Sequence, residues 1–151
     1  MRRFRSIDEL RDAAGETLGT SSWLEVSQDM IDRFADVTGD YQWIHVDAER
    51  ARHSPYGRTV AHGWLTVALM PRLRNEIFAV EGVTTSINYG CDRLRFIEPV
   101  PSGSRIRLGL KLLRTEPARQ GVRITLEATI EREGAERPAL VAELIVLLLP
   151  A

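Results

Sequence analysis

Cysteine and lysine are scarce in this sequence. Cys91 is the only cysteine among 151 residues, so no disulfide can form within the chain. Lys111 is the only lysine among 20 lysines and arginines, and 21 aspartates and glutamates bring the formal net charge to −1. A chain so close to neutral lacks the basic excess with which proteins grip nucleic acid or an acidic membrane surface.

Long apolar runs are also missing. The longest covers residues 144–149, far fewer than the roughly 20 residues that a membrane-spanning helix needs. The basic residues at the start, Arg2, Arg3 and Arg5, are not followed by the apolar stretch of a secretory signal. Together with the single cysteine, this predicts a soluble, cytoplasmic protein with no membrane partner.

Several signatures of cofactor and metal chemistry are absent. The sequence has no G-x-x-x-x-G-K phosphate loop, no G-x-G-x-x-G turn and no G-x-S-x-G nucleophile elbow. Its three histidines, His45, His53 and His62, have no cysteine nearby and form no H-x-x-x-H pair. We therefore expect neither a metal site nor a bound cofactor.

Helical patterns fill the first half of the chain. Helices are predicted over 7–14, over 28–38 between Ser27 and Gly39, and over 48–52 behind Asp47. The longest pattern covers 63–80 and is apolar on nearly all sides, which predicts a largely buried helix. Pro71 lies within it and should kink or split it, because proline lacks an N–H.

The pattern changes to period two after Gly82. Strands are predicted over 83–96 with a bend at Gly90, and over 105–112, 122–130 and 140–149. This order predicts an α+β fold, a single hot-dog domain over 1–151 in which a curved antiparallel sheet wraps around the long helix. A small sheet of this kind has an open edge, and pairing with a second copy would cover it, so a homodimer is expected.

One segment concentrates the polar groups that chemistry requires. Asp40 and His45 follow directly after the predicted helix end at Gly39, with Trp43 and Ile44 between them to exclude bulk water. Loops at such positions often carry functional side chains. The spacing also allows a purely structural role, in which Asp40 caps a turn and His45 is a hydrogen-bonded, half-buried histidine.

The same segment resembles the hydratase-2 motif of the MaoC-like, (R)-specific enoyl-CoA hydratase and dehydratase family. That motif reads Gly-Asp-x-Asn-Pro-x-His, followed by His-Gly at the start of the central helix. Here the stretches are Gly39–His45, with Gln42-Trp43 in place of Asn-Pro, and then His62-Gly63. The likeness extends over the whole chain, and it includes the nodulation-protein-N-like branch, where Gln-Trp also occurs. Some hydratases carry a serine where this chain has Pro71.

The resemblance implies reversible syn addition of water to a trans-2-enoyl thioester, giving an (R)-3-hydroxyacyl product. Asp40 and His45 would be the catalytic pair, and the N–H of Gly63 would stabilise the oxyanion. Substrate contacts are expected from aromatic residues around the motif, namely Tyr41, Trp43, His62 and Trp64. The substrate would be an acyl-CoA, with coenzyme A as part of it. Arg93 and Arg95 could meet its phosphates or simply form the solvated face of a strand.

Two other functions stay open at this point. A hot-dog acyl-CoA thioesterase needs an acidic residue near the central helix, and the first one in that helix is Glu76, close to its far end. A non-catalytic protein that binds acyl thioesters or takes part in signalling would not need Asp40, His45 and Gly63 together.

Overall fold

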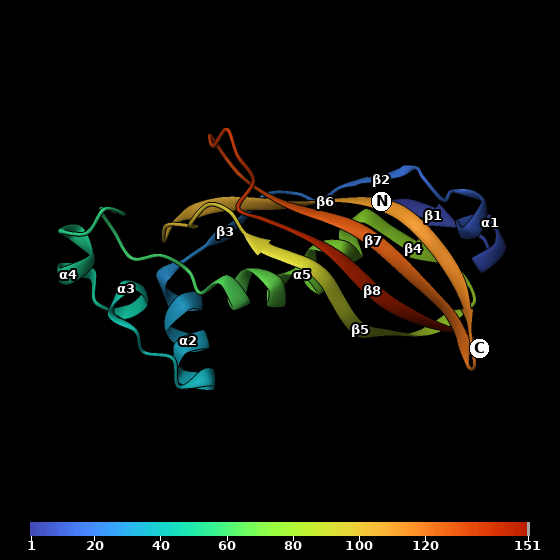
Figure 1. Cartoon of the computed structure of the whole chain (residues 1–151), viewed down its shortest axis with the longest axis horizontal. Helices are drawn as coiled ribbons and strands as arrows, with labels where there is room; N and C mark the ends of the chain where they lie inside the picture. The colour runs from blue at the N-terminus through green and yellow to red at the C-terminus, as the bar shows by residue number, and fades with distance from the viewer. Residues whose placement is uncertain (151) are drawn as a thin grey trace.

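A computed structural model describes residues 1–150 and shows a curved sheet laid over one long helix (Figure 1). Three shorter helices, α2, α3 and α4, gather beyond one end of the sheet, and α1 lies at the other end (Figure 1). The helices are α1 (Ile7–Asp12), α2 (Gln28–Thr38), α3 (Trp43–Val46), α4 (Ala48–Arg52) and α5 (Gly63–Ile77). The strands are β1 (Arg2–Phe4), β2 (Thr17–Thr20), β3 (Leu24–Val26), β4 (Phe78–Val80), β5 (Val83–Phe96), β6 (Ser104–Ala118), β7 (Gly121–Arg132) and β8 (Leu140–Pro150).

The main sheet has the strand order β2-β6-β7-β8-β5, and β3 also pairs with β6. All of these pairings are antiparallel. The apolar alternation along β6 and β7 turns one face inward, where side chains such as Leu108, Leu110, Ile124 and Leu126 are fully buried. The four long strands predicted from period two are confirmed, and the bend expected at Gly90 coincides with a register shift there.

Helix α5 supplies the other side of the core through Leu65, Met70, Leu73 and Ile77. Its predicted end at residue 80 is wrong, because the helix stops at Ile77 and residues 78–80 form β4. Strand β4 pairs in parallel with β1, and the ring of Phe78 meets that of Phe4 edge-on at 6.4 Å. Burial of these two aromatic rings favours the extended conformation over another helical turn.

Two further expectations for α5 differ from the structure. Of the kink or split expected at Pro71, the split does not occur, because one helix runs from Gly63 to Ile77. Packing of its buried face against the sheet holds it together although one intrahelical hydrogen bond is lost. The helix is also not buried on all sides, since Trp64 is 60% exposed in the single chain.

The predicted caps position the segment that carries Asp40. The hydroxyl of Ser27 accepts a hydrogen bond from the N–H of Met30 at the start of α2. Gly39 ends this helix with a φ of 73°, in the left-handed region that glycine adopts without strain. The chain then turns through α3 toward α4, where the Asp47 carboxylate accepts from the N–H of Arg50.

Strand β5 forms one edge of the main sheet. None of its 14 residues is buried, and large apolar side chains such as Ile87, Tyr89 and Phe96 are exposed. The side chain of Tyr89 is 61% exposed. Among the described residues, no helix is long and apolar enough to cross a membrane.

Candidate active site

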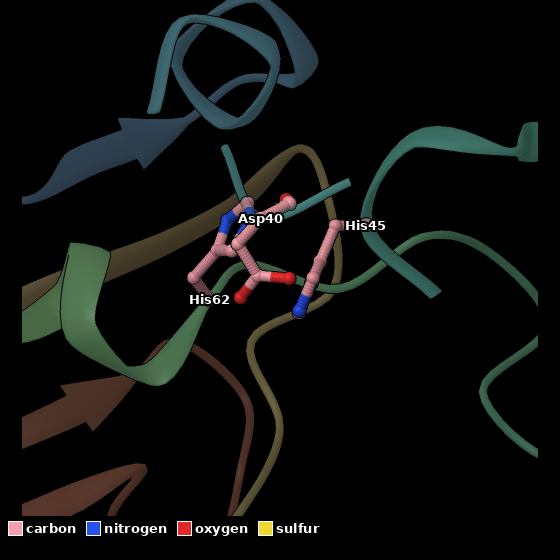
Figure 2. Close-up of side chains that lie close together, drawn as sticks. All are labelled: Asp40, His45 and His62. Carbon is pink, nitrogen blue, oxygen red and sulfur yellow. Dashed lines mark hydrogen bonds between the residues drawn. The ribbon is translucent and has the colours of Figure 1, made fainter. Parts of the chain in front are cut away.

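Asp40 and His45 approach each other at the junction of α2 and α3 (Figure 2). Asp40 lies in the exposed turn after Gly39, and His45 lies buried in α3. The Asp40 carboxylate and a ring nitrogen of His45 are within 4.8 Å. Within residues 1–150 no hydrogen bond or ion pair joins these side chains directly. One water making hydrogen bonds of about 2.8 Å to both groups would span such a gap.

The imidazole of His45 is fixed by the backbone on one side. Its Nδ1 lies 2.6 Å from the carbonyl oxygen of Val60. Because a carbonyl only accepts hydrogen bonds, this contact assigns the proton to Nδ1 and leaves a lone pair on Nε2. Burial lowers the pKa of His45 below its ordinary value of 6.5, and the proximity of His62 lowers it further. A neutral His45 with a free Nε2 lone pair is a base.

His62 contacts both members of the pair. Its ring stacks on His45 with the ring centroids 3.8 Å apart and an interplanar angle of 23°. Its Nε2 lies 2.9 Å from the backbone carbonyl oxygen of Asp40, so this nitrogen is the donor. Phe34 of α2 covers the same ring at a centroid distance of 4.9 Å. The Nδ1 of His62 is buried and has no hydrogen-bond partner among residues 1–150.

Gly63 begins α5 directly after His62. The carbonyl of His62 accepts from the N–H groups of Leu65 and Thr66, whereas the first N–H groups of a helix have no carbonyl of their own helix to bond. A Cβ at residue 63 would lie 2.7–2.9 Å from the ring of Phe96, which is too close. A side chain at this position would therefore displace the ring of Phe96, and the N–H of Gly63 lies at the positive end of the helix dipole.

A cavity of about 360 Å³ adjoins these groups. His45 and Gly63 line it together, and Trp64 contributes its exposed ring, which meets that of Phe96 edge-on at 5.8 Å. The structure thus brings four of the predicted residues to one place. They are Asp40, His45, His62 and Gly63, with Trp64 at the cavity wall.

Two predicted substrate contacts lie elsewhere. The hydroxyl of Tyr41 donates to the Asp36 carboxylate at 3.0 Å, and the ring is exposed. That hydrogen bond raises the pKa of Tyr41. The ring of Trp43 is covered by the guanidinium of Arg50 at 4.3 Å. Neither side chain lines the cavity, because the turn at 40–42 and helix α3 direct them away from it.

Other charged groups considered from the sequence have local partners. Glu76 accepts hydrogen bonds from both the N–H and the hydroxyl of Ser22, which lowers the pKa of this carboxyl. Arg93 forms an ion pair with Glu143 at 3.0 Å, and Arg95 donates to the carbonyl of Leu94. None of these three charged side chains lines the cavity beside His45.

Asp40, His45 and His62 each place one potential metal-ligand atom within 4.8 Å of the other two. Imidazole nitrogens bind metals in the plane of the ring, and two nearly parallel stacked rings direct their lone pairs past each other. The arrangement favours proton transfer over metal binding, and the expected absence of a metal stays a prediction.

Comparison with known protein families shows to which family the chain belongs. Residues 9–133 match the family described as "MaoC like domain", which covers most of the sequence. The chain belongs to the MaoC-like family. The resemblance seen in the Gly39–His45 and His62-Gly63 stretches is thereby confirmed.

Named relatives of this MaoC-like chain match over nearly their full length. It is 49% identical over 147 residues to 3-hydroxyacyl-thioester dehydratase Z of Mycobacterium tuberculosis, covering 97% of both proteins. It is 40% identical over 153 residues to nodulation protein N of Rhizobium leguminosarum, covering 95% of this chain and 91% of the relative. The nodulation-N-like likeness in the Gln42-Trp43 dipeptide is consistent with the second match.

Solved structures establish the fold. The (R)-hydratase PhaJ1 of Pseudomonas aeruginosa superposes with a TM-score of 0.73 at 22% identity, covering 91% of this chain and 83% of that one. The (R)-hydratase of A. caviae gives a TM-score of 0.73 at 21% identity, covering 89% and 96%. The predicted hot-dog fold, a single domain with a sheet around a central helix, is confirmed.

The MaoC-like site contains residues that the sequence did not single out. Phe96 packs against Gly63 from the end of β5, Val60 orients His45 through its backbone carbonyl, and Glu98 lines the cavity while paired with Arg137 at 3.1 Å. A backbone carbonyl carries no sequence signal. For Phe96, the only sequence signal was its place at the end of the predicted strand 83–96.

Proposed function

We propose that this MaoC-like chain is a hydro-lyase, an (R)-specific enoyl-CoA hydratase and 3-hydroxyacyl-thioester dehydratase. The observation that carries the proposal is the arrangement of Asp40 and neutral His45 across a gap of one water, beside the N–H of Gly63. The 49% identity to a protein named 3-hydroxyacyl-thioester dehydratase Z supports the same reaction. The reaction belongs to fatty acid metabolism.

Hydration begins with water held between Asp40 and His45. Water is a poor nucleophile, so it needs a base and a fixed position. The pair removes one proton as the water oxygen forms a bond to the β-carbon of the enoyl thioester. The pair then returns a proton to the α-carbon on the same face, which completes a syn addition.

Charge develops on the thioester oxygen during this step. Attack at the β-carbon moves an electron pair through the double bond and produces an enolate. The N–H of Gly63 donates to that oxygen at the start of α5, where the helix dipole favours negative charge. A single donor of this kind stabilises one developing charge, which favours a neutral thioester over a free carboxylate. No cofactor takes part in these steps, and coenzyme A is a portion of the substrate.

The functional unit in this proposal is a cytoplasmic homodimer. Exposed apolar side chains along the edge strand β5, among them Ile87 and Tyr89, support pairing with a second copy. The same seam contains Phe96 and approaches Trp64, so the pantetheine arm enters the cavity close to it. The lone cysteine fits a reducing compartment. Light scattering at micromolar concentration should give twice the chain mass, and a stable, active monomer would refute this assembly.

The alternative functions are less well supported by the site. A hot-dog thioesterase requires an acidic residue on or near the central helix that directs water to the thioester carbonyl. Glu76 is bound to Ser22, and Glu98 is paired with Arg137. A non-catalytic acyl-thioester-binding protein or signalling protein has no need for a neutral histidine with a free Nε2.

The test is the hydration of crotonyl-CoA, followed as loss of the enoyl-thioester absorbance, with chiral analysis of the product. We expect (R)-3-hydroxybutyryl-CoA and a much lower rate with free crotonate. An (S)-product, or equal rates on the thioester and the acid, would overturn the proposed reaction. Release of free coenzyme A without hydration would instead favour the thioesterase.

A further inference from the structure

A second cavity, of about 460 Å³, lies between α5 and the strands β5 and β8. Most of its lining is apolar, with side chains such as Val67, Met70, Leu144 and Val146. Two polar side chains interrupt this lining, namely Arg74 from α5 and Asn88 from β5. A cavity of this composition suits a hydrocarbon chain that carries a polar group at one end.

This cavity continues the line of the first one along α5. Gly63, Val67 and Arg74 are separated by four and seven residues, so they lie along one stripe of the helix. Strand β5 contributes to both cavities, with Phe96 at the first and Gly90 at the second. A thioester with its carbonyl at Gly63 therefore has its acyl chain directed toward Arg74.

Arg74 and Arg132 are the two arginines among residues 1–150 that are half-buried and have no ion-pair partner, and Arg74 is the one that lines this cavity. It is half-buried, whereas Arg72 on the same helix is exposed. Within residues 1–150 no carboxylate lies within 4.0 Å of its guanidinium, and no hydrogen-bond partner of that group is found. Burial lowers the pKa of Arg74, yet an arginine stays protonated at neutral pH. A partly desolvated cation without a counter-charge is costly, and a bound anion would relieve this cost.

We propose that Arg74 binds a carboxylate at the far end of the acyl chain, so the preferred substrates are 2-enoyl thioesters of dicarboxylic acids. This inference rests on the proposed hydratase function and adds its substrate class. Guanidinium and carboxylate form two parallel hydrogen bonds in a favourable geometry. The amide of Asn88 in the same cavity supplies a further donor.

The spacing along α5 sets the length of chain that fits. Gly63 and Arg74 are eleven residues apart, which corresponds to roughly 16 Å along a helix axis. The long side chain of Arg74 leans back toward the start of the helix and shortens this distance. A chain of medium length therefore reaches the guanidinium, whereas a crotonyl group does not. Crotonyl-CoA thus tests the chemistry at Asp40 and His45 independently of Arg74.

The experiment compares three substrates of equal length: trans-2-octenoyl-CoA, trans-2-octenedioyl-CoA with its free terminal carboxylate, and the methyl ester of the latter. For the wild type we expect kcat/KM to be roughly tenfold higher for the free carboxylate than for the other two. Arg74→Met should abolish this preference, and Arg74→Lys should retain part of it. Arg72→Met, the matched control on the exposed side of the helix, should behave as wild type.

Binding of the saturated analogues gives a readout that does not depend on turnover. Calorimetry should show that octanedioyl-CoA binds roughly tenfold more tightly than octanoyl-CoA to the wild type, and equally to Arg74→Met. Equal affinities in the wild type, together with normal hydration of crotonyl-CoA, would overturn the dicarboxylate inference and leave the hydratase function standing. Failure to hydrate crotonyl-CoA while the binding preference persists would overturn the hydratase function alone.

Discussion

Replacing His62 by phenylalanine separates the stability of the site from its activity. Two energetic effects of this change oppose each other. The hydrogen bond from Nε2 to the Asp40 carbonyl is lost, at a cost of about 1 kcal/mol. The buried Nδ1 without a partner is removed as well, and such an orphaned group destabilises a fold by about 1–3 kcal/mol. Phenylalanine keeps an aromatic ring between His45 and Phe34.

We therefore expect His62→Phe to change the free energy of unfolding by no more than about 1 kcal/mol, measured by urea denaturation. Activity should behave differently, because the Asp40 backbone loses its anchor. A misplaced catalytic group commonly lowers turnover by one to two orders of magnitude, so kcat for crotonyl-CoA should fall roughly 10- to 100-fold. KM should change little, since the cavity walls are unchanged.

His62→Gln is the complementary variant, because its amide retains a donor for the Asp40 carbonyl but lacks the ring. In both variants the electrostatic influence of His62 on His45 is lost, and the acid limb of the rate profile should move to higher pH. His53→Phe, at an exposed histidine, is the control and should match wild type. Wild-type kcat in His62→Phe, or a loss of stability well above 2 kcal/mol, would refute this reasoning.

Three other predictions concern Gly63, His45 and the edge strand β5. Gly63→Ala should lower kcat/KM because its Cβ meets the ring of Phe96, and Phe96→Leu in the same chain should restore part of it; an unaffected single variant would count against the contact. Because burial holds the pKa of His45 below 6.5, kcat/KM should stay constant at neutral pH and fall only on acidification below that value. The unfolded chain binds this proton first, so the free energy of unfolding should fall as the pH drops from 6.5 toward the folded pKa of His45, and His45→Gln should reduce that dependence. Ile87→Lys on β5 should shift the dimer toward monomer in light scattering, and an unchanged mass would show that β5 is not the interface.

The boundaries of helices with capping residues were predictable from the sequence. Ser27, Gly39 and Asp47 each form the cap that their residue type indicates, because capping is a local interaction. Short parallel strands have no such signal. The three-residue strands β1 and β4 exist because burial of Phe4 against Phe78 holds them together, and this contact joins residues 74 positions apart.

The site shows the same division between local and tertiary information. The spacing of Asp40 and His45 left a structural role open, and the resemblance to the hydratase-2 motif identified them as a pair together with the glycine at the start of α5. The stacking of His62 on His45 and the position of Phe96 depend on how α2, α5 and β5 pack. Tyr41 shows the converse, because a residue inside the motif points to Asp36 and away from the cavity.

The most direct test of the proposed reaction is the rate of crotonyl-CoA hydration in Asp40→Asn, His45→Gln and the double variant. Each single change removes one of the two groups that hold and deprotonate the water, so each should lower kcat by several orders of magnitude without unfolding the chain. The double variant should be little slower than either single one, since residues that act as a unit are not additive. Nearly wild-type turnover in Asp40→Asn, or fully multiplicative losses in the double variant, would contradict the mechanism.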